Sequence, residues 1–241
     1  MEPLVDGLLL DCHGLIQHFH NTGEAEGERA AGLPAGTLAN YAYQHPSYDL
    51  AKVGVISNRA WVQGVQDRLT TDCGPQAAAA IGPWCADRGD VDWVMVDLVA
   101  QARQHVPVAV LSNFTDELHA DFAAHGLSDS FDLVLSSADL QVQKPSPVAY
   151  LRAAERMSLN PDRIWFTDDT SEYVTAARHT GLQAELYTGV EAFARHLNAM
   201  GIPVQVRPST TIPAAVTTTD DPGVSNTRVA GLRRYRADRT P

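Results

Sequence analysis

The feature that most constrains this chain is an alternation of short apolar runs with segments of helical period. Five runs of three or four residues are apolar enough to form buried strands, at residues 8–10, 108–111, 133–135, 164–166 and 184–187. All but the first adjoin segments in which apolar residues recur every three or four positions, as they do in amphipathic helices. This alternation is typical of a parallel sheet covered by helices on both faces. We therefore predict an α/β fold with a Rossmann-like, doubly wound parallel sheet.

Residues 17–90 interrupt the alternation, because they contain no run that is typical of a strand. They contain amphipathic pieces instead, such as Ser57 followed by Trp61, Val65 and Leu69 at four-residue spacing. Glycine and proline residues divide this stretch into short helices joined by turns. We predict a small helical insert at residues 17–90, between the first and second strands of a core formed by residues 1–16 and 91–205. Residues 206–241 lack periodicity and are expected to be disordered.

Composition excludes several classes of protein and partner. The chain has 241 residues, of which 44% are hydrophobic and 20% charged, as in ordinary globular domains. A formal charge of −11 disfavours a nucleic-acid partner, which needs a basic surface. No apolar run approaches the roughly 18 residues of a membrane span, and the N-terminus lacks the cationic region of a signal peptide. Three scattered cysteines form no CxxC pair. We expect a cytoplasmic protein with a small-molecule substrate and no membrane partner; the oligomeric state stays open.

Polar side chains follow the predicted strands, at the edge where open parallel sheets bind ligands. Three are carboxylates, and crowded carboxylates repel one another unless a cation joins them. Hard oxygen ligands favour Mg²⁺, and a lysine beside a nucleophilic aspartate can neutralise a phosphate. The residues at this edge are Asp11, Ser112, Asn113, Lys144, Asp168 and Asp169.

This set of residues resembles the active site of the haloacid dehalogenase superfamily. Four segments resemble the motifs of that superfamily and occur in its order: LLLDCHGLI, VAVLSN, QKPSP and IWFTDDTSEYVTAARHTGLQA. The resemblance covers residues 8 to about 200. It implies that the helical insert is a cap, which closes over the site and selects the substrate.

The resemblance also implies a metal site and a nucleophile. Asp11 would attack phosphorus and form an aspartyl intermediate, and its carboxylate would also bind Mg²⁺. The backbone carbonyl of His13 would be a second metal ligand. Asp168 and Asp169 would complete the site, with Asp169 the better candidate for direct coordination.

The remaining motif residues would bind the substrate. Ser112 and Asn113 would donate hydrogen bonds to the transferring group, and Lys144 would bridge the nucleophile and the phosphate. Metal and lysine together would stabilise the negative charge of a phosphoryl transition state. The implied activity is that of a Mg²⁺-dependent phosphatase acting on a phosphorylated small molecule.

His13 departs from the family pattern, in which phosphatases carry a second aspartate two residues after the nucleophile. Three interpretations stay open. The imidazole could replace that aspartate as general acid and base. The substrate could need no strong acid, or Asp11 could carry out another displacement, such as dehalogenation. Alternatively, the site could be degenerate, and the domain a binding or regulatory protein without turnover.

Three neighbours of these motifs have less specific interpretations. His18 and His20 match no defensible metal-ligand spacing, and we expect them to lie on the loop into the cap, in contact with substrate. Cys12 follows the nucleophile in a strand, so its side chain should point to the opposite face and be buried. We predict Thr115 as the N-cap of the helix after the second motif, and Leu151 as an inward-facing residue of the helix after the third.

Overall fold

The structure is a computed structural model that describes residues 3–207. Residues 208–241, most of the segment predicted to be disordered, lie outside the described residues. A five-stranded parallel sheet has the order β5-β4-β1-β6-β7. Its strands are β1 Gly7–Leu10, β4 Val108–Ser112, β5 Leu133–Ser136, β6 Ile164–Asp168 and β7 Gln183–Leu186. The structure confirms the predicted α/β fold, with small differences at strand ends.

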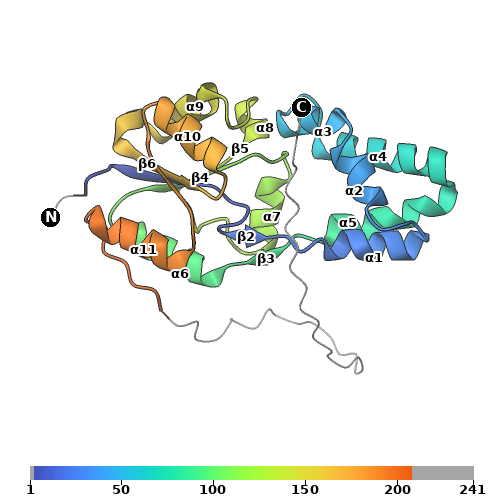
Figure 1. Ribbon diagram of the computed structural model, residues 1–241, viewed down its shortest axis with the longest axis horizontal. Coiled ribbons are helices and arrows are strands. Elements are labelled where there is room, and N and C mark those ends of the chain that lie inside the picture. The colour runs from blue at the N-terminus through green and yellow to red at the C-terminus, as the bar shows by residue number, and fades with distance from the viewer. Residues whose placement is uncertain (1–2, 208–241) are drawn as a thin grey trace. The chain divides into compact units, whose positions relative to one another are not determined.

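Helices cover both faces of this sheet (Figure 1). One face packs against α6 Trp93–Ala102, α7 Leu118–Ala124 and α11 Val190–Ala199, and the other against α8 Ser137–Leu140, α9 Pro147–Met157 and α10 Ser171–His179. The alternation along β1 shows why the strands read as continuous apolar runs. Leu8 and Leu10 belong to the first apolar cluster and Leu9 to the second, so every residue of this run is buried, as are those of the runs at 108–111 and 164–166.

The helical insert comprises residues 22–86 and has an apolar cluster of its own. Its elements are α1 Thr22–Ala31, α2 Thr37–Tyr43, α3 Ser47–Lys52, α4 Asn58–Cys73, the 3₁₀ helix η1 Pro75–Ala80 and α5 Ile81–Ala86. The four-residue pattern in α4 is confirmed: Trp61, Val65 and Leu69 are buried. The Ser57 hydroxyl caps this helix by accepting a hydrogen bond from the Ala60 amide.

A short linker joins the insert to the core. It contains the antiparallel strands β2 Gln17–His18 and β3 Asp90–Val91, which sequence periodicity could not reveal because each has two residues. Arg88, just before β3, holds the linker to α7. Its guanidinium contacts Asp121 and lies 3.2 Å from Glu117, and its carbonyl oxygen accepts a hydrogen bond from the Gln17 side chain.

Two predictions about helices of the core are wrong. Thr115 is not the N-cap of α7, which is Glu117; its hydroxyl accepts a hydrogen bond from the Glu117 amide at 3.3 Å and donates one to Asn58 in the insert. Leu151 is 47% exposed, because the inward stripe of α9 runs through Tyr150, Ala153 and Ala154.

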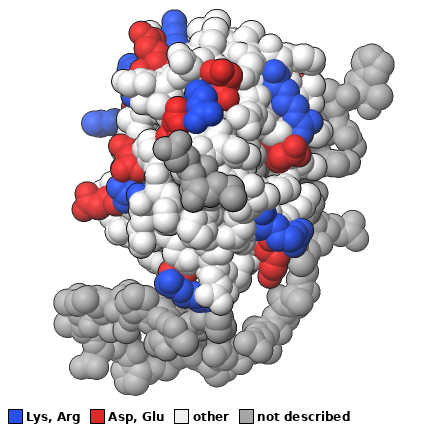
Figure 2. Space-filling view, turned by 90° about the vertical axis from the view of Figure 1, so that its left-hand side faces the viewer, with Lys and Arg blue, Asp and Glu red and all other residues white. Residues whose placement is uncertain are grey.

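On the face shown in Figure 2, basic and acidic side chains are interspersed rather than gathered by sign. Among residues 3–207, none of the helices has the length and hydropathy that crossing a bilayer requires.

Candidate active site

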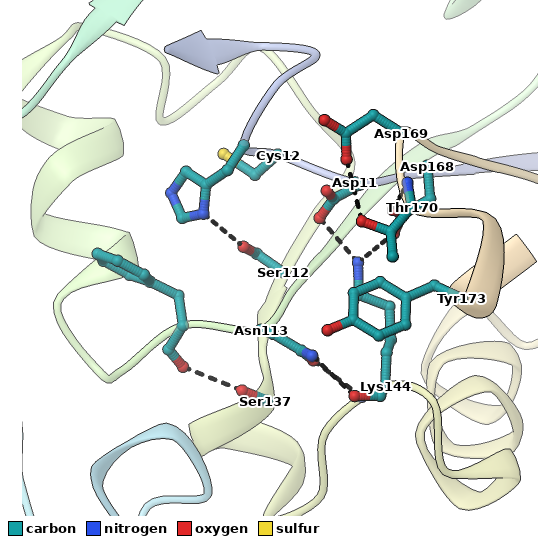
Figure 3. Close-up of polar contacts among 12 residues, drawn as sticks. Asp11, Cys12, Ser112, Asn113, Ser137, Lys144, Asp168, Asp169, Thr170 and Tyr173 are labelled. Carbon is teal, nitrogen blue, oxygen red and sulfur yellow. Dashed lines mark hydrogen bonds and ion pairs between the residues drawn. The ribbon is translucent and has the colours of Figure 1, made fainter. Parts of the chain in front are cut away.

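Asp11, Lys144 and Asp168 meet at the carboxyl edge of the sheet (Figure 3). The Lys144 ammonium donates to Asp11 Oδ1 at 2.7 Å and to Asp168 Oδ2 at 2.6 Å. Lys144 is 2% exposed, Asp11 7% and Asp168 0%. The backbone amide of Thr170 donates to the other carboxylate oxygen of Asp168 at 2.8 Å. Both oxygens of Asp168 are therefore engaged, and its evident task is to hold the lysine.

Burial and mutual attraction act against each other in this group. Burial alone would lower the pKa of Lys144, but the Asp11 and Asp168 carboxylates raise it above its ordinary value. Burial raises the pKa of Asp168 to about 6, and the nearby Asp11 charge adds to the increase. Burial also raises the pKa of Asp11, against the attraction of Lys144. The lysine is therefore charged at neutral pH, and it is the group that allows two buried carboxylates to lie together.

Asn113 and Tyr173 hold Lys144 in place. The Asn113 amide donates to the Lys144 carbonyl at 2.8 Å and accepts from the Lys144 backbone amide at 2.8 Å. This pair of hydrogen bonds gives the asparagine after β4 a structural role, and its contact with substrate stays a prediction. Tyr173 lies with its ring 5.1 Å from the Lys144 ammonium. Tyr173 was not among the predicted site residues, although it lies within the fourth motif, in the helix that follows Asp168 and Asp169.

Asp169 supplies a third carboxylate beside the first two. One oxygen each of Asp11, Asp168 and Asp169 lie within 4.8 Å of one another. Gly14 makes room for Asp169: a Cβ at Gly14 would lie 2.3 Å from an Asp169 oxygen, and the φ of +89° at Gly14 also favours glycine. Three carboxylates and one ammonium leave a formal excess of two negative charges, and hard carboxylate oxygens are preferred ligands of Mg²⁺. The donor set therefore fits Mg²⁺. Lys144 and the Thr170 amide engage both oxygens of Asp168, whereas the more exposed Asp169 accepts from the Thr170 hydroxyl through its Oδ1, so Asp169 is the better placed of the two.

His13 lies between two aromatic rings rather than in a polar pocket. Its ring centroid is 5.2 Å from that of Phe19 and 4.8 Å from that of Phe114, both edge-on. Its Nδ1 is 3.4 Å from the Ser112 hydroxyl, while Nε2 is buried without a hydrogen-bond partner among the described residues. Burial, aided by the Lys144 charge, lowers the pKa of His13 to about 4. The imidazole is therefore neutral at pH 7.

The structure places the other predicted residues as follows. The Ser112 side chain is fully buried and reaches His13. His18 and His20 lie in and just after β2, where each faces an aspartate of the returning chain: His18 is 3.8 Å from Asp92, and His20 is 3.2 Å from Asp90. Their contact with substrate stays a prediction.

Cys12 is fully buried in the apolar cluster of the α6, α7 and α11 face, as its position in the strand predicted. Burial raises the pKa of its thiol, as does the Asp11 charge, so the thiol is not poised to act as a nucleophile.

Comparison with known proteins establishes the family. A model of haloacid dehalogenase-like hydrolases matches residues 5–181. The chain belongs to this family of hydrolases, as its four motifs predicted.

Individual relatives differ in their chemistry. The chain is 38% identical over 65 residues to (S)-2-haloacid dehalogenase 4A of Burkholderia cepacia, a match that covers 27% of this chain and 28% of that protein. It is 30% identical over 91 residues to fructose-1-phosphate phosphatase YqaB of Escherichia coli K12, covering 37% and 48%. The matches thus span less than half the length of these two relatives.

Solved structures show the same fold. The HAD family enzyme BT-2542 of Bacteroides thetaiotaomicron, in complex with magnesium and inorganic phosphate, has a TM-score of 0.63 and 18% identity. The match covers 76% of this chain and 94% of that one.

Proposed function

We propose that this protein is a Mg²⁺-dependent phosphatase that acts on a phosphorylated small molecule through an aspartyl-phosphate at Asp11. The observation that carries the proposal is the charge balance of the site. Asp11, Asp168 and Asp169 gather three carboxylates around one ammonium, that of Lys144. A divalent cation would neutralise the excess. Displacement of a halide by Asp11 alone gives no reason for a third carboxylate.

The residues of the site divide the reaction between them. Asp11 is the nucleophile: one carboxylate oxygen is held by Lys144, and the other is left to attack phosphorus. The bond from phosphorus to the leaving oxygen then breaks, and that oxygen takes a proton. In the second step, water attacks the aspartyl-phosphate, which releases inorganic phosphate and regenerates the Asp11 carboxylate.

Asp11 and Asp169, with the backbone carbonyl of His13, would hold Mg²⁺. The ion, when bound, supplies positive charge where negative charge spreads over the transferring phosphoryl oxygens. Support comes from BT-2542, a structural neighbour that was solved with magnesium and inorganic phosphate. Lys144 supplies a further positive charge at Asp11 Oδ1. Ser112, at the end of β4, is the remaining hydroxyl beside His13 and is proposed to contact the transferring group.

His13 has the position of the family's acid and base, and its surroundings affect that role. The neutral imidazole between Phe19 and Phe114 has a nitrogen that could accept a proton from water in the second step, but only as a weak base, because its lowered pKa disfavours the imidazolium that results. Donation of a proton to the leaving group is harder, because the apolar surroundings disfavour the imidazolium. The helical insert is proposed to act as the cap that excludes water and selects the substrate.

A second candidate is dehalogenation at Asp11, which the aromatic surroundings of His13 and the 38% identity to a haloacid dehalogenase favour. Asp11 would displace halide from carbon, and hydrolysis of the resulting ester would follow. This reaction requires no metal and no acid for the leaving group.

One experiment separates the two. Purified protein is assayed for phosphate release from phosphate esters and acyl phosphates, and for halide release from 2-haloacids, with Mg²⁺ and with EDTA. Asp11→Asn serves as the inactive control. We expect Mg²⁺-dependent phosphate release that Asp11→Asn abolishes. Halide release in EDTA without any phosphate release would refute the phosphatase proposal. A folded protein that binds Mg²⁺ but turns over neither substrate class would point to a binding role.

A further inference from the structure

We propose that Asn58 is a positioning residue, which couples docking of the helical insert to the geometry of the active-site loop. The active-site loop is residues 113–117, the segment between β4 and α7. The proposal rests on the proposed function for its kinetic consequence, but its structural consequence can be measured without any substrate.

Asn58 contacts three successive residues of the active-site loop. Its backbone amide donates to Asp116 Oδ1 at 2.6 Å, and its side-chain amide lies 3.4 Å from Glu117 Oε2. Its side-chain oxygen accepts a hydrogen bond from the Thr115 hydroxyl at 3.1 Å. Both ends of the Asn58 side chain are thus used across the boundary between insert and core.

The local structure of the insert prepares Asn58 for these contacts. Asn58 is the first residue of α4, and Ser57 caps the helix, so the first turn is fixed before the core is contacted. The positive end of a 16-residue helix favours nearby carboxylates, and the loop presents Asp116 and Glu117 there. Geometry and charge therefore agree at this contact.

The other residues of the active-site loop contact the reaction centre. The side-chain amide of Asn113 hydrogen-bonds to both the carbonyl and the amide of the Lys144 backbone. Phe114 packs its ring against His13. Thr115, which hydrogen-bonds to Asn58, is the next residue after Phe114 and is 1% exposed. A shift of the loop at Thr115 would therefore move the support of both Lys144 and His13.

Two further sets of contacts link the active-site loop to the insert and its linker. The Ser137 hydroxyl lies 2.6 Å from the Lys52 carbonyl of the insert and 3.2 Å from the Phe114 carbonyl of the loop. Glu117 lies within reach of Asn58 in α4 and of Arg88 in the linker. Because Arg88 belongs to the linker, its contacts with Glu117 and Asp121 can persist while the insert moves. The contacts of Asn58, together with that of the Lys52 carbonyl, therefore depend on docking of the insert, and Asn58 is the one of the two that bonds to the loop directly.

Hydrogen exchange measured by mass spectrometry tests the structural part in the substrate-free, full-length protein. Asn58→Ala should speed amide exchange in residues 112–118 by about tenfold, since two side-chain hydrogen bonds are lost. Asn40→Ala is the matched control, because Asn40 is an exposed asparagine of α2 in the same insert. It should leave exchange in residues 112–118 unchanged. Equal exchange in wild type and Asn58→Ala would overturn the proposal.

Steady-state kinetics test the positioning role with whichever substrate the wild-type enzyme turns over. Asn58→Ala should lower kcat by about tenfold with a smaller change in KM, while Tm falls by about 5 °C or less. Thr115→Val removes the hydroxyl that donates a hydrogen bond to Asn58, and it should also lower kcat. Thr115→Ser keeps a hydroxyl and should have a kcat close to that of the wild type. An unchanged kcat in both Asn58→Ala and Thr115→Val would overturn the positioning role. Failure of the proposed phosphatase activity would leave the exchange result standing, so the two failures are distinguishable.

Discussion

Replacing Lys144 with methionine should destabilise the fold strongly at neutral pH and much less in mild acid. The ammonium lies 2.7 Å from Asp11 and 2.6 Å from Asp168, and all three residues are buried. Methionine has nearly the same length and leaves little cavity, so the lost charge dominates the effect. Removal of one partner from a buried ion pair typically costs about 3–5 kcal/mol, and we expect that loss at pH 7.5.

The pH dependence follows from the direction of the pKa shifts. Burial already raises the pKa of Asp168 to about 6 while Lys144 opposes the increase, so the variant should raise it further. A carboxyl whose pKa is higher in the folded than in the unfolded state weakens the fold once it is ionised. That penalty is absent below an unfolded pKa of about 4 and grows as the pH rises through the folded pKa. The stability gap between wild type and Lys144→Met should therefore shrink from pH 7.5 to pH 5.

Urea unfolding followed by tryptophan fluorescence, in EDTA, measures this gap. Lys52→Met is the matched control, since the chain has only these two lysines. Lys52 pairs at 3.0 Å with an Asp49 that is 63% exposed, and its loss should cost about 1 kcal/mol or less. A loss below about 1 kcal/mol for Lys144→Met, or a gap that stays constant from pH 7.5 to pH 5, would refute the reasoning.

Three further predictions follow from the site and its surroundings. Gly14→Ala should weaken Mg²⁺ binding, measured by titration calorimetry, because its Cβ would displace the Asp169 carboxylate; Gly126→Ala, with a similar positive φ but open space around it, should not. His13→Ala should depress turnover strongly while Mg²⁺ affinity stays nearly unchanged, and an undiminished kcat would exclude His13 from the chemistry. Burial raises the pKa of Asp121 to about 6, so its charge weakens the fold as the pH rises from about 4 to about 6. Asp121→Asn should therefore make the urea unfolding midpoint less dependent on pH between about 4 and about 6. A midpoint that changes with pH as steeply as in the wild type would contradict this.

The sheet could be predicted because its three central strands, β4, β1 and β6, are buried on both faces. Leu8, Leu9 and Leu10 all avoid water, so the run is apolar throughout and ends abruptly at Asp11. The same reasoning located the candidate site, since parallel strands present their carboxyl ends at one edge. Parallel order also explains why residues from four distant motifs could be expected together before any contact was known.

The partners of individual side chains could not be predicted in the same way. Thr115 has the residue type and position of a helix cap, but its hydroxyl bonds to Asn58, a residue 57 positions earlier. Asn113 was expected to contact the substrate, which stays a prediction, but the hydrogen bonds of its amide to the Lys144 backbone were not foreseen. In both cases a polar group satisfied its hydrogen bonds through a long-range contact, which periodicity and local propensity do not encode.

The active-site loop shows how one short segment serves several parts of the molecule at once. Asn113 contacts the lysine segment, Phe114 contacts His13, and Thr115 contacts the insert. Successive side chains of an irregular loop point in different directions, so neighbours in sequence acquire partners that are far apart in the chain. Because these partners share one backbone, a change at any of the three positions alters the support of the other two. The effects of substitutions within this loop should therefore not be additive, whereas each should add to that of a distant substitution such as Arg163→Ala.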